Sequence, residues 1–337
     1  TVCSLTLRMP LLRAPTATSG YSNARWLRSN HILLTVLPED NVKLTRRQMI
    51  ITAGIFLALA VLGGVVSMIG RATPIVFSGQ RAFRDVNYQV SLGPRIPGNT
   101  AHSQTIDYIY QTLKKYGWEL EIQEVEVMGQ PLKNVIAKRG SGDEWIILGA
   151  HFDTRRFADR DPNPQLQYDP VPGANDGASG VAVLLELGRV LPKDLDKQVW
   201  LVFFDGEDQG EIPTWDWILG SKGFAASMTD LPDAAVIVDM VGDAALQIFK
   251  ETNSDPELTA QIWKAARQAG YGKVFVDEEK YSILDDHFPF LKLGVPAVDI
   301  IDFDYPYWHT TSDTADKTSP ESLSAVGITL YNWLLKD

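Results

Sequence analysis

Carboxylate and histidine side chains recur after apolar runs of this sequence. The five that stand out are His151, Asp176, Glu207, Asp208 and His309. Zinc in proteins is bound by histidine nitrogens and carboxylate oxygens at about 2.0–2.2 Å, and a zinc ion with three protein ligands keeps one position open for chemistry. A carboxylate next to such an ion can act as a base. These residue types therefore predict a metal site with a carboxylate base beside it, and hence a zinc enzyme.

Each of these side chains also has an ordinary structural interpretation. Asp176 stands in a glycine-rich turn before an expected helix, where aspartate commonly serves as the N-cap. The adjacent Glu207 and Asp208 could form a solvated turn, and His309 could be a structural histidine beside Trp308. Acidic or histidine residues at three separate strand ends make coincidence a weak explanation. The sequence also has no serine nucleophile elbow, Walker A loop, G-x-G-x-x-G or H-E-x-x-H motif.

The hydrophobic pattern from about residue 75 onward predicts alternating strands and helices. Short apolar runs predict strands at 134–137, 145–149, 199–204, 235–240 and 297–301. Helical spacing and cap residues predict helices at 101–116, 177–191, 256–269 and 320–335. This alternation predicts a single α/β domain at 75–337, with a mostly parallel, mixed central sheet and helices on both faces. Sites in such sheets form at the carboxyl ends of strands, where His151, Glu207 and Asp239 fall.

Composition narrows the class of protein. The chain has 337 residues, with 45% hydrophobic and 22% charged side chains, as expected of a globular protein. Its net charge of -11 argues against a nucleic-acid partner, which would need a basic stripe. Cys3 is the single cysteine, so an intramolecular disulfide and a cysteine-ligated zinc site in the domain are both excluded.

The N-terminal part predicts a membrane anchor. Residues 49–69 form an uncharged run of 21 residues, long enough to span a bilayer as a helix within 45–71. Lys43, Arg46 and Arg47 precede it, so the positive-inside rule places the domain outside the cytoplasm, in the periplasm or at the cell surface. A cleaved twin-arginine export signal and a buried core helix are the alternatives. Residues 1–44 are expected to be a disordered tail, or sequence upstream of a true start at Met49.

Seven segments resemble a known family as a set. In chain order they are GAHFDT, PGANDGASGVAVLLELGR, FFDGED, LGSKGF, VDMVGD, DDHFPFLKLGVP and YWHTTSDT. Residues from about 80 to 337 are similar through them to the zinc-dependent aminopeptidase-type exopeptidase superfamily, and within it to the bacterial glutaminyl-peptide cyclotransferase (glutaminyl cyclase) branch. The membrane segment and residues 1–44 lie outside the resemblance.

The resemblance implies a role for each matching residue. Asp176, Asp208 and His309 would be zinc ligands, and Glu207 would be the general acid and base. Many relatives have Glu where this chain has Asp208, which shortens the ligand by one methylene group. His151 and Asp239 would bind a second zinc in an aminopeptidase, or lie just outside the single zinc site of a cyclase. One zinc is therefore expected for a cyclase and two for an aminopeptidase.

The Asp-Asp-His segment favours the cyclase. Aminopeptidases of the superfamily tend to have Ser where this chain has Asp285, whereas cyclases have Asp, hydrogen-bonded to the catalytic Glu through a shared network. The resemblance thus implies catalytic roles for Glu207, Asp285 and Asp239. Aromatic and apolar side chains could form a narrow pocket for a glutamine side chain, although ordinary core packing would also explain them. These are Trp308, Tyr305, Ile283 and one or both of Trp215 and Trp217.

The resulting prediction is a membrane-anchored or exported enzyme that acts on peptide or protein N-termini. It would cyclise N-terminal glutamine to pyroglutamate and release ammonia in a zinc-dependent reaction. The alternative on the same scaffold is a zinc aminopeptidase with one or two metal ions. A third hypothesis, a catalytically inactive binding module on a membrane anchor, predicts gaps in the set of site residues, and the sequence has none.

Overall fold

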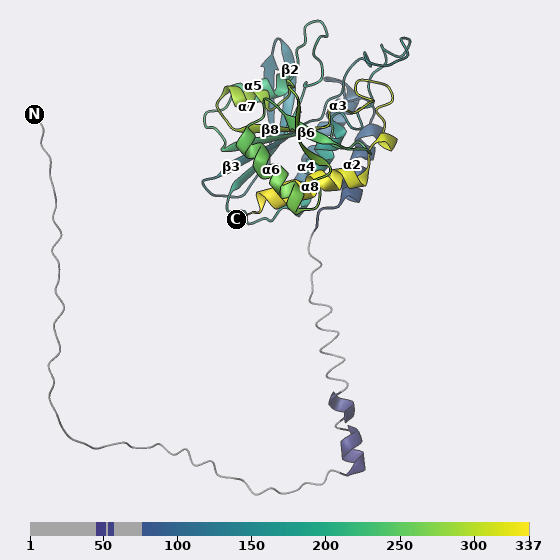
Figure 1. Ribbon diagram of the computed structural model, residues 1–337, viewed down its shortest axis with the longest axis vertical. Helices are drawn as coiled ribbons and strands as arrows, with labels where there is room; N and C mark the ends of the chain where they lie inside the picture. Colours follow the sequence, from purple (N-terminus) through teal and green to yellow (C-terminus); the bar gives the residue numbers. More distant parts are fainter. Residues whose placement is uncertain (1–44, 52, 57–75, 337) are drawn as a thin grey trace, which may run out of the picture. The chain divides into compact units, whose positions relative to one another are not determined.

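The computed structural model describes residues 45–51, 53–56 and 76–336, which fall into two units (Figure 1). In the first unit, residues 46–51 and 53–56 are helical, and the side chains of Thr45 and Gln48 cap the start of this helix reciprocally. No helix within the described ranges combines the length and the apolar content that a membrane crossing needs. Most of the predicted membrane segment, 49–69, lies outside these ranges. The anchor, and the location of the domain outside the cytoplasm, stay predictions.

The second unit, Thr73–Asp337, alternates helices and strands. Its helices are α2 (Gly79–Ser91), α3 (Thr100–Lys115), α4 (Ala178–Val190), α5 (Leu219–Ala226), α6 (Pro256–Gln268), α7 (Phe288–Lys292) and α8 (Pro320–Leu334). Its strands are β1 (Glu119–Val127), β2 (Gln130–Arg139), β3 (Trp145–His151), β4 (Gln198–Phe204), β5 (Ala234–Asp239), β6 (Ile248–Glu251), β7 (Phe275–Tyr281) and β8 (Ala297–Ile301).

The central sheet has six strands in the order β1-β2-β4-β3-β5-β8. Strands β4, β3, β5 and β8 run parallel, whereas β2 is antiparallel to both β4 and β1. The prediction of an α/β domain with a mixed central sheet is therefore confirmed. Strands β6 and β7 form a separate parallel pair.

Helices cover both faces of the sheet because its central strands are apolar on both sides. Along β3, Ile146 and Leu148 point into a core formed with α2, α3, α4, α6 and α8. Between them, Ile147 points the opposite way, into a smaller core completed by Phe224 of α5 and Phe290 of α7. Figure 1 shows α5 and α7 beside each other and apart from α2, α4 and α8. A strand buried on both faces has a continuous apolar run, which is why the pattern predicted it.

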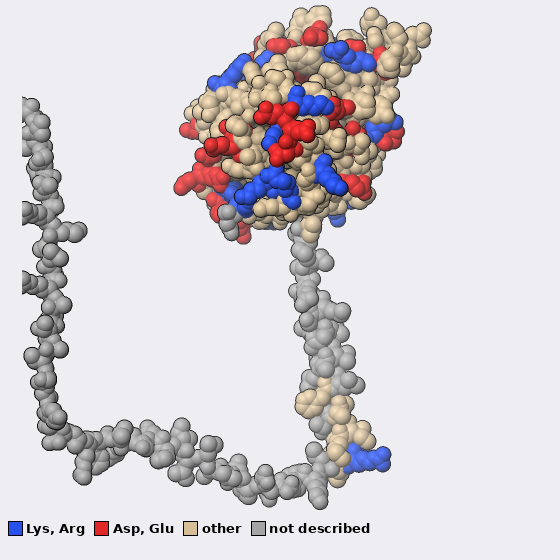
Figure 2. All heavy atoms as spheres, viewed as in Figure 1, with Lys and Arg blue, Asp and Glu red and all other residues tan. Residues whose placement is uncertain are grey.

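Charged side chains of both signs lie on the surface of the domain. On the face that Figure 2 shows, acidic and basic groups are interspersed. Two ion pairs at the surface are Lys197 with Glu144 at 2.9 Å and Lys222 with Asp216 at 2.6 Å. Pairs of this kind contribute at most about 1 kcal/mol each, because water screens them. The two apolar cores therefore stabilise the domain more than its surface charges do.

Several elements were not predicted, and β1 is the clearest case. Its sequence ELEIQEVEV alternates glutamate with apolar residues on either side of a break at Gln123, and its side chains are half-buried or exposed. It pairs with β2 through a two-residue turn in which Met128 has φ 55° and Gly129 has φ 75°. This left-handed pair is the backbone that a tight hairpin requires.

Close packing of α4 against the sheet brings Asp176 to the strand ends. A Cβ atom added to Gly180 would lie 2.1 Å from the carbonyl oxygen of Val238 in β5. A Cβ atom at Gly177 would lie 2.7 Å from the carbonyl oxygen of His151. The two glycines therefore let the start of α4 approach β3 and β5 more closely than any other residue would allow.

Replacement of Gly180 by alanine should destabilise the domain. The methyl group would overlap a backbone carbonyl that cannot rotate away, so we expect a loss of about 1–3 kcal/mol in the free energy of unfolding. This loss should appear in urea unfolding even though alanine is the better helix former by about 1 kcal/mol. Gly272→Ala is the control, because its nearest neighbour is the flexible side chain of Arg267 at 3.1 Å. Equal stability of the two variants would contradict the close-packing argument.

Candidate active site

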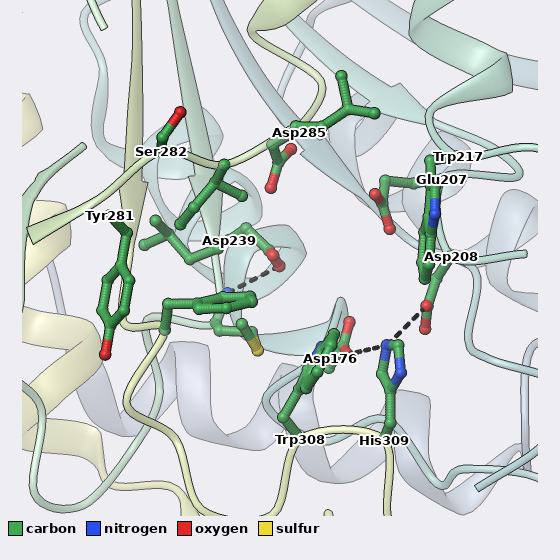
Figure 3. A pocket seen from close by; sticks show the side chains of 15 residues that line it. Asp176, Glu207, Asp208, Trp217, Asp239, Tyr281, Ser282, Asp285, Trp308 and His309 are labelled. Carbon is green, nitrogen blue, oxygen red and sulfur yellow. Dashed lines mark hydrogen bonds and ion pairs between the residues drawn. The ribbon is translucent and has the colours of Figure 1, made fainter. Parts of the chain in front are cut away.

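The predicted site residues converge at the carboxyl edge of the parallel strands. His151 ends β3 and Asp239 ends β5, while Glu207 and Asp208 follow β4. Asp176 lies in the turn before α4, and His309 lies in the segment after β8. The side chains of Asp176, Glu207, Asp208, Asp239 and His309 line one cavity (Figure 3). Residues up to 158 positions apart in the sequence thus form a single site, as the parallel topology requires.

Asp176, Asp208 and His309 form a group suited to a metal ion. The Nε2 atom of His309 lies 3.0 Å from Oδ1 of Asp208 and 3.8 Å from Oδ2 of Asp176. One ligand atom from each of the three lies within 4.8 Å of the others, and all three residues are buried. Neither carboxylate oxygen of Asp208 accepts a hydrogen bond within the described part of the chain. A buried carboxylate without donors is costly, and zinc accepts this set of oxygen and nitrogen ligands.

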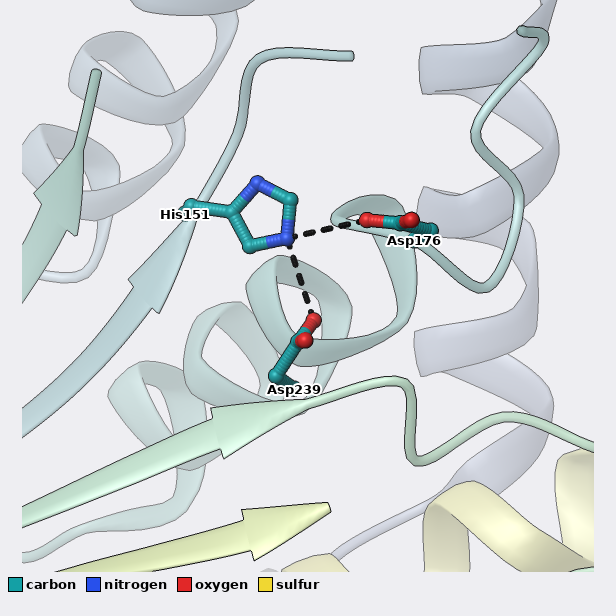
Figure 4. A group of neighbouring side chains, drawn as sticks. All are labelled: His151, Asp176 and Asp239. Carbon is teal, nitrogen blue, oxygen red and sulfur yellow. Dashed lines mark hydrogen bonds and ion pairs between the residues drawn. The ribbon is translucent and has the colours of Figure 1, made fainter. Parts of the chain in front are cut away.

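His151, Asp176 and Asp239 form a second group beside the first (Figure 4). The Nε2 atom of His151 lies 3.2 Å from Oδ1 of Asp176 and 3.0 Å from Oδ1 of Asp239. Asp176 thus directs one oxygen toward each histidine. The geometry therefore has candidate ligands for one or for two metal ions.

Glu207 is a buried carboxyl group whose pKa is shifted upward by its surroundings. Burial raises the pKa of Glu207 well above its ordinary range, and the carboxylates of Asp285 and Asp208 raise it further. Burial, together with the charge of Asp239, raises the pKa of Asp285 to about 7. The carboxylates of Glu207 and Asp285 both point into the cavity in Figure 3. A carboxyl group that titrates closer to neutral pH transfers protons more effectively in both directions.

Two buried carboxylates that were not assigned in the sequence fix the turns that carry the site. Asp153 accepts hydrogen bonds from the backbone N–H groups of Glu207 (3.0 Å) and Asp208 (3.3 Å). Asp313 accepts them from the backbone N–H groups at Asn175 (2.8 Å) and Asp176 (3.2 Å). Both lie inside the quoted segments GAHFDT and YWHTTSDT, which was the available signal. Their role is to hold the backbone beneath the candidate ligands.

The pocket walls match the predicted set only in part. A cavity of about 270 Å³ is lined by Trp217, Trp308 and Ile283, as expected. Tyr305 does not line it, because its buried hydroxyl donates to Asp313 at 2.7 Å and supports the turn instead. Trp215 also lies outside the lining. It is half-buried, with the Arg156 guanidinium 5.9 Å from its ring.

The lining residues that the sequence did not single out lie at or just after the ends of three strands, β5, β7 and β8. The full additional set is Met240, Tyr281, Ser282, Leu284, Ile301 and Phe303. Strand β7 was not predicted, so the sequence placed Ile283 and Asp285 at the site but not the end of the strand that precedes them.

Comparison with known proteins identifies the family. The model for "Peptidase family M28" matches residues 134–334. The chain belongs to this family. Among curated members, a glutaminyl-peptide cyclotransferase from Drosophila melanogaster is 29% identical over 263 residues, covering 66% of this chain and 71% of the relative.

Two solved structures of bacterial proteins match the fold as well as the sequence. A glutaminyl cyclase from Porphyromonas gingivalis has a TM-score of 0.73 at 34% identity, covering 77% of this chain and 98% of that one. A leucine aminopeptidase precursor from Bacteroides thetaiotaomicron has the same TM-score at 31% identity, covering 78% and 98%. The structures similar to this chain thus carry the names of both predicted activities.

The metal-free protein should lose stability as the pH rises from about 5 to 8. Burial raises the pKa of Asp285 and of Asp313 from 3.8 to about 7, so the folded state keeps protons there that the unfolded state has lost. Burial alone would lower the pKa of His309, but neighbouring carboxylates, led by Asp208, raise it from 6.5 to about 9. This raised pKa also makes the folded state keep a proton that the unfolded state has lost. Because the folded state binds more protons throughout this window, stability falls with pH.

Urea unfolding in a metal chelator at pH 5 and at pH 8 measures this effect. We expect a difference of more than about 1.4 kcal/mol, the value of one pKa unit. Saturating zinc should reduce or reverse the difference, because metal binding requires deprotonated ligands. A metal-free protein that becomes more stable toward pH 8 would contradict the prediction.

Proposed function

We propose that the chain is a zinc-dependent glutaminyl-peptide cyclotransferase. It would convert N-terminal glutamine of peptides or proteins to pyroglutamate and release ammonia. The observation that carries the proposal is the position of Asp285, whose buried carboxylate shares one cavity with Glu207 and the candidate metal ligands. The similarity to glutaminyl cyclases over most of the domain supports the same reaction.

The cavity fits a short side chain with an apolar stem and a polar end. Its volume of about 270 Å³ is small for a ligand pocket, and Trp217, Trp308 and Ile283 supply apolar walls. Candidate metal ligands and Glu207 supply the polar end. A glutamine side chain has two methylene groups followed by a carboxamide, so its carboxamide would reach the polar end while its stem contacts the tryptophans.

Asp176, Asp208 and His309 are the residues that would hold the zinc ion. Bound there, zinc supplies Lewis-acid polarisation of the carboxamide oxygen. Glu207 accepts a proton from the α-amine, whose nitrogen forms a bond to the side-chain carbonyl carbon. The same Glu207 then returns the proton to the leaving nitrogen as the carbon–nitrogen bond breaks, and ammonia departs. Asp285 and Asp239 keep protons close to Glu207, since adjacent buried carboxylates do not all ionise together.

An aminopeptidase is the alternative that a specific observation favours. The group formed by His151, Asp176 and Asp239 has the ligands for a second metal ion next to the first. With two metal ions, Glu207 would act as the base for a water molecule that attacks the first peptide bond. The similarity to a leucine aminopeptidase precursor supports this activity.

Metal content and two substrates distinguish the activities. We expect the zinc-loaded chain to contain about one zinc ion and to release ammonia from a peptide that begins with glutamine. It should leave a leucine anilide intact. Zinc removal by a chelator should abolish ammonia release, and zinc addition should restore it. About two zinc ions per chain together with anilide cleavage would replace the cyclase proposal with the aminopeptidase.

Replacement of Glu207 by glutamine should remove catalysis while metal binding persists. Glutamine keeps the size of the side chain but can neither accept nor return the proton, so we expect kcat to fall about 10²- to 10⁴-fold. Zinc content, measured by elemental analysis, should match that of the wild-type chain. Glu211→Gln is the control, since Glu211 is exposed in the same segment and lies outside the cavity lining. Full activity of Glu207→Gln would refute the assigned role.

A further inference from the structure

The segment 155–161 lies against His309 and holds its backbone. His309 has φ 55°, a left-handed conformation that is unfavourable for residues with a side chain. The backbone N–H of Arg160 donates to the carbonyl oxygen of His309 at 3.2 Å. One residue further along, the carboxylate of Asp161 accepts from the backbone N–H (3.0 Å) and the hydroxyl (2.6 Å) of Thr311. These contacts oppose the backbone strain at the candidate ligand.

Asp159 of this segment also contacts the histidine ring. Its Oδ1 atom lies 3.2 Å from Nδ1 of His309, whereas the carboxylates of Asp208 and Asp176 lie near the other ring nitrogen, Nε2. A carboxylate at Nδ1 favours the tautomer that carries its hydrogen there. When the ring is neutral, this leaves Nε2 with a free lone pair on the side of the other candidate ligands.

Arg155 connects Asp159 to the second candidate ligand, Asp208. Its side chain is 2% exposed, and its Nε and Nη2 atoms donate to the two carboxylate oxygens of Asp159 at 2.9 and 2.5 Å. Its Nη1 atom donates to the backbone carbonyl of Asp208 at 3.3 Å and lies 3.7 Å from that residue's Oδ1. The guanidinium carbon also lies 4.8 Å from the ring centroid of Trp217, which stacks on His309.

We propose that Asp159 and Arg155 are positioning residues for the metal ion. Asp159 fixes the orientation and tautomer of His309, and Arg155 holds Asp159 and the Asp208 backbone in one arrangement. The inference rests on the proposed zinc site but applies equally to a cyclase and to an aminopeptidase. Arg155 and Asp159 have opposite charges, so together they order two ligands without changing the net charge of the site. Carboxylate partners of metal-bound histidines commonly contribute to metal affinity in this way.

Zinc affinity of the full chain tests the proposal without an activity assay. The wild-type chain and Asp159→Asn are stripped of metal and titrated with zinc against a chelator of known affinity. We expect zinc binding by Asp159→Asn to weaken roughly 10- to 100-fold. Asp169→Asn is the matched control, because it removes the same charge from an exposed position of the same loop, and it should bind zinc as the wild type does. The visible absorption of bound cobalt should change in Asp159→Asn and not in the control.

Thermal melting of the metal-free variants separates positioning from a structural role. The Asp159 side chain is 38% exposed, so we expect the metal-free Asp159→Asn to melt close to the wild type. If it melts far lower, the variant Asp159→Glu distinguishes a positioning role from a structural one, because Glu retains an acceptor for Nδ1–H of His309. Recovery of zinc affinity in Asp159→Glu supports the proposal. Equal weakening in both variants, or zinc affinity of Asp159→Asn within threefold of the wild type, overturns it.

Discussion

Burial of negative charge at the carboxyl edge of the sheet is the constraint on which the site depends. Ionised carboxylates cannot be removed from water without donors, protons or cations to compensate them. Asp153 and Asp313 accept hydrogen bonds from the turns above the strands. Burial raises the pKa values of Glu207 and Asp285, so protons compensate these carboxyl groups. Asp208, whose oxygens accept no hydrogen bond among the described residues, is left for a cation. Hydrogen bonds, protons and the proposed cation thus each compensate part of one acidic cluster.

This division explains how two activities can belong to one fold. Asp176 faces both histidines, so the same ligands can surround one ion or two. Under the proposed cyclase function, the reaction depends on neighbours of the candidate metal site, such as Asp285, which lines the same cavity as Glu207. Family membership rests on the sequence match over residues 134–334, whereas the proposed activity rests on these few side chains. Function in this family is therefore argued from the site and not from the fold.

Periodicity and strand ends were the parts of the structure that could be predicted from the sequence. Apolar runs placed β3, β4 and β5, and parallel topology then brought His151, Glu207 and Asp239 together. The direction of individual aromatic side chains could not be predicted. Tyr305 is turned away from the pocket by its hydrogen bond to Asp313. Trp217 lines the cavity and Trp215 does not, and the path of an irregular loop sets this difference. The contact between Asp159 and His309 was missed because it joins two loops that have no periodicity.

The sheet edge formed by β1 has a consequence for the solution behaviour of the domain. An outer strand offers unpaired backbone groups to any second chain that approaches it. In β1 these groups are accompanied by four glutamates, at positions 119, 121, 124 and 126, along a strand of nine residues. Two copies that met edge to edge would bring these like charges together and would strip water from them. The glutamates of the hairpin thus oppose edge-to-edge pairing of two β1 strands.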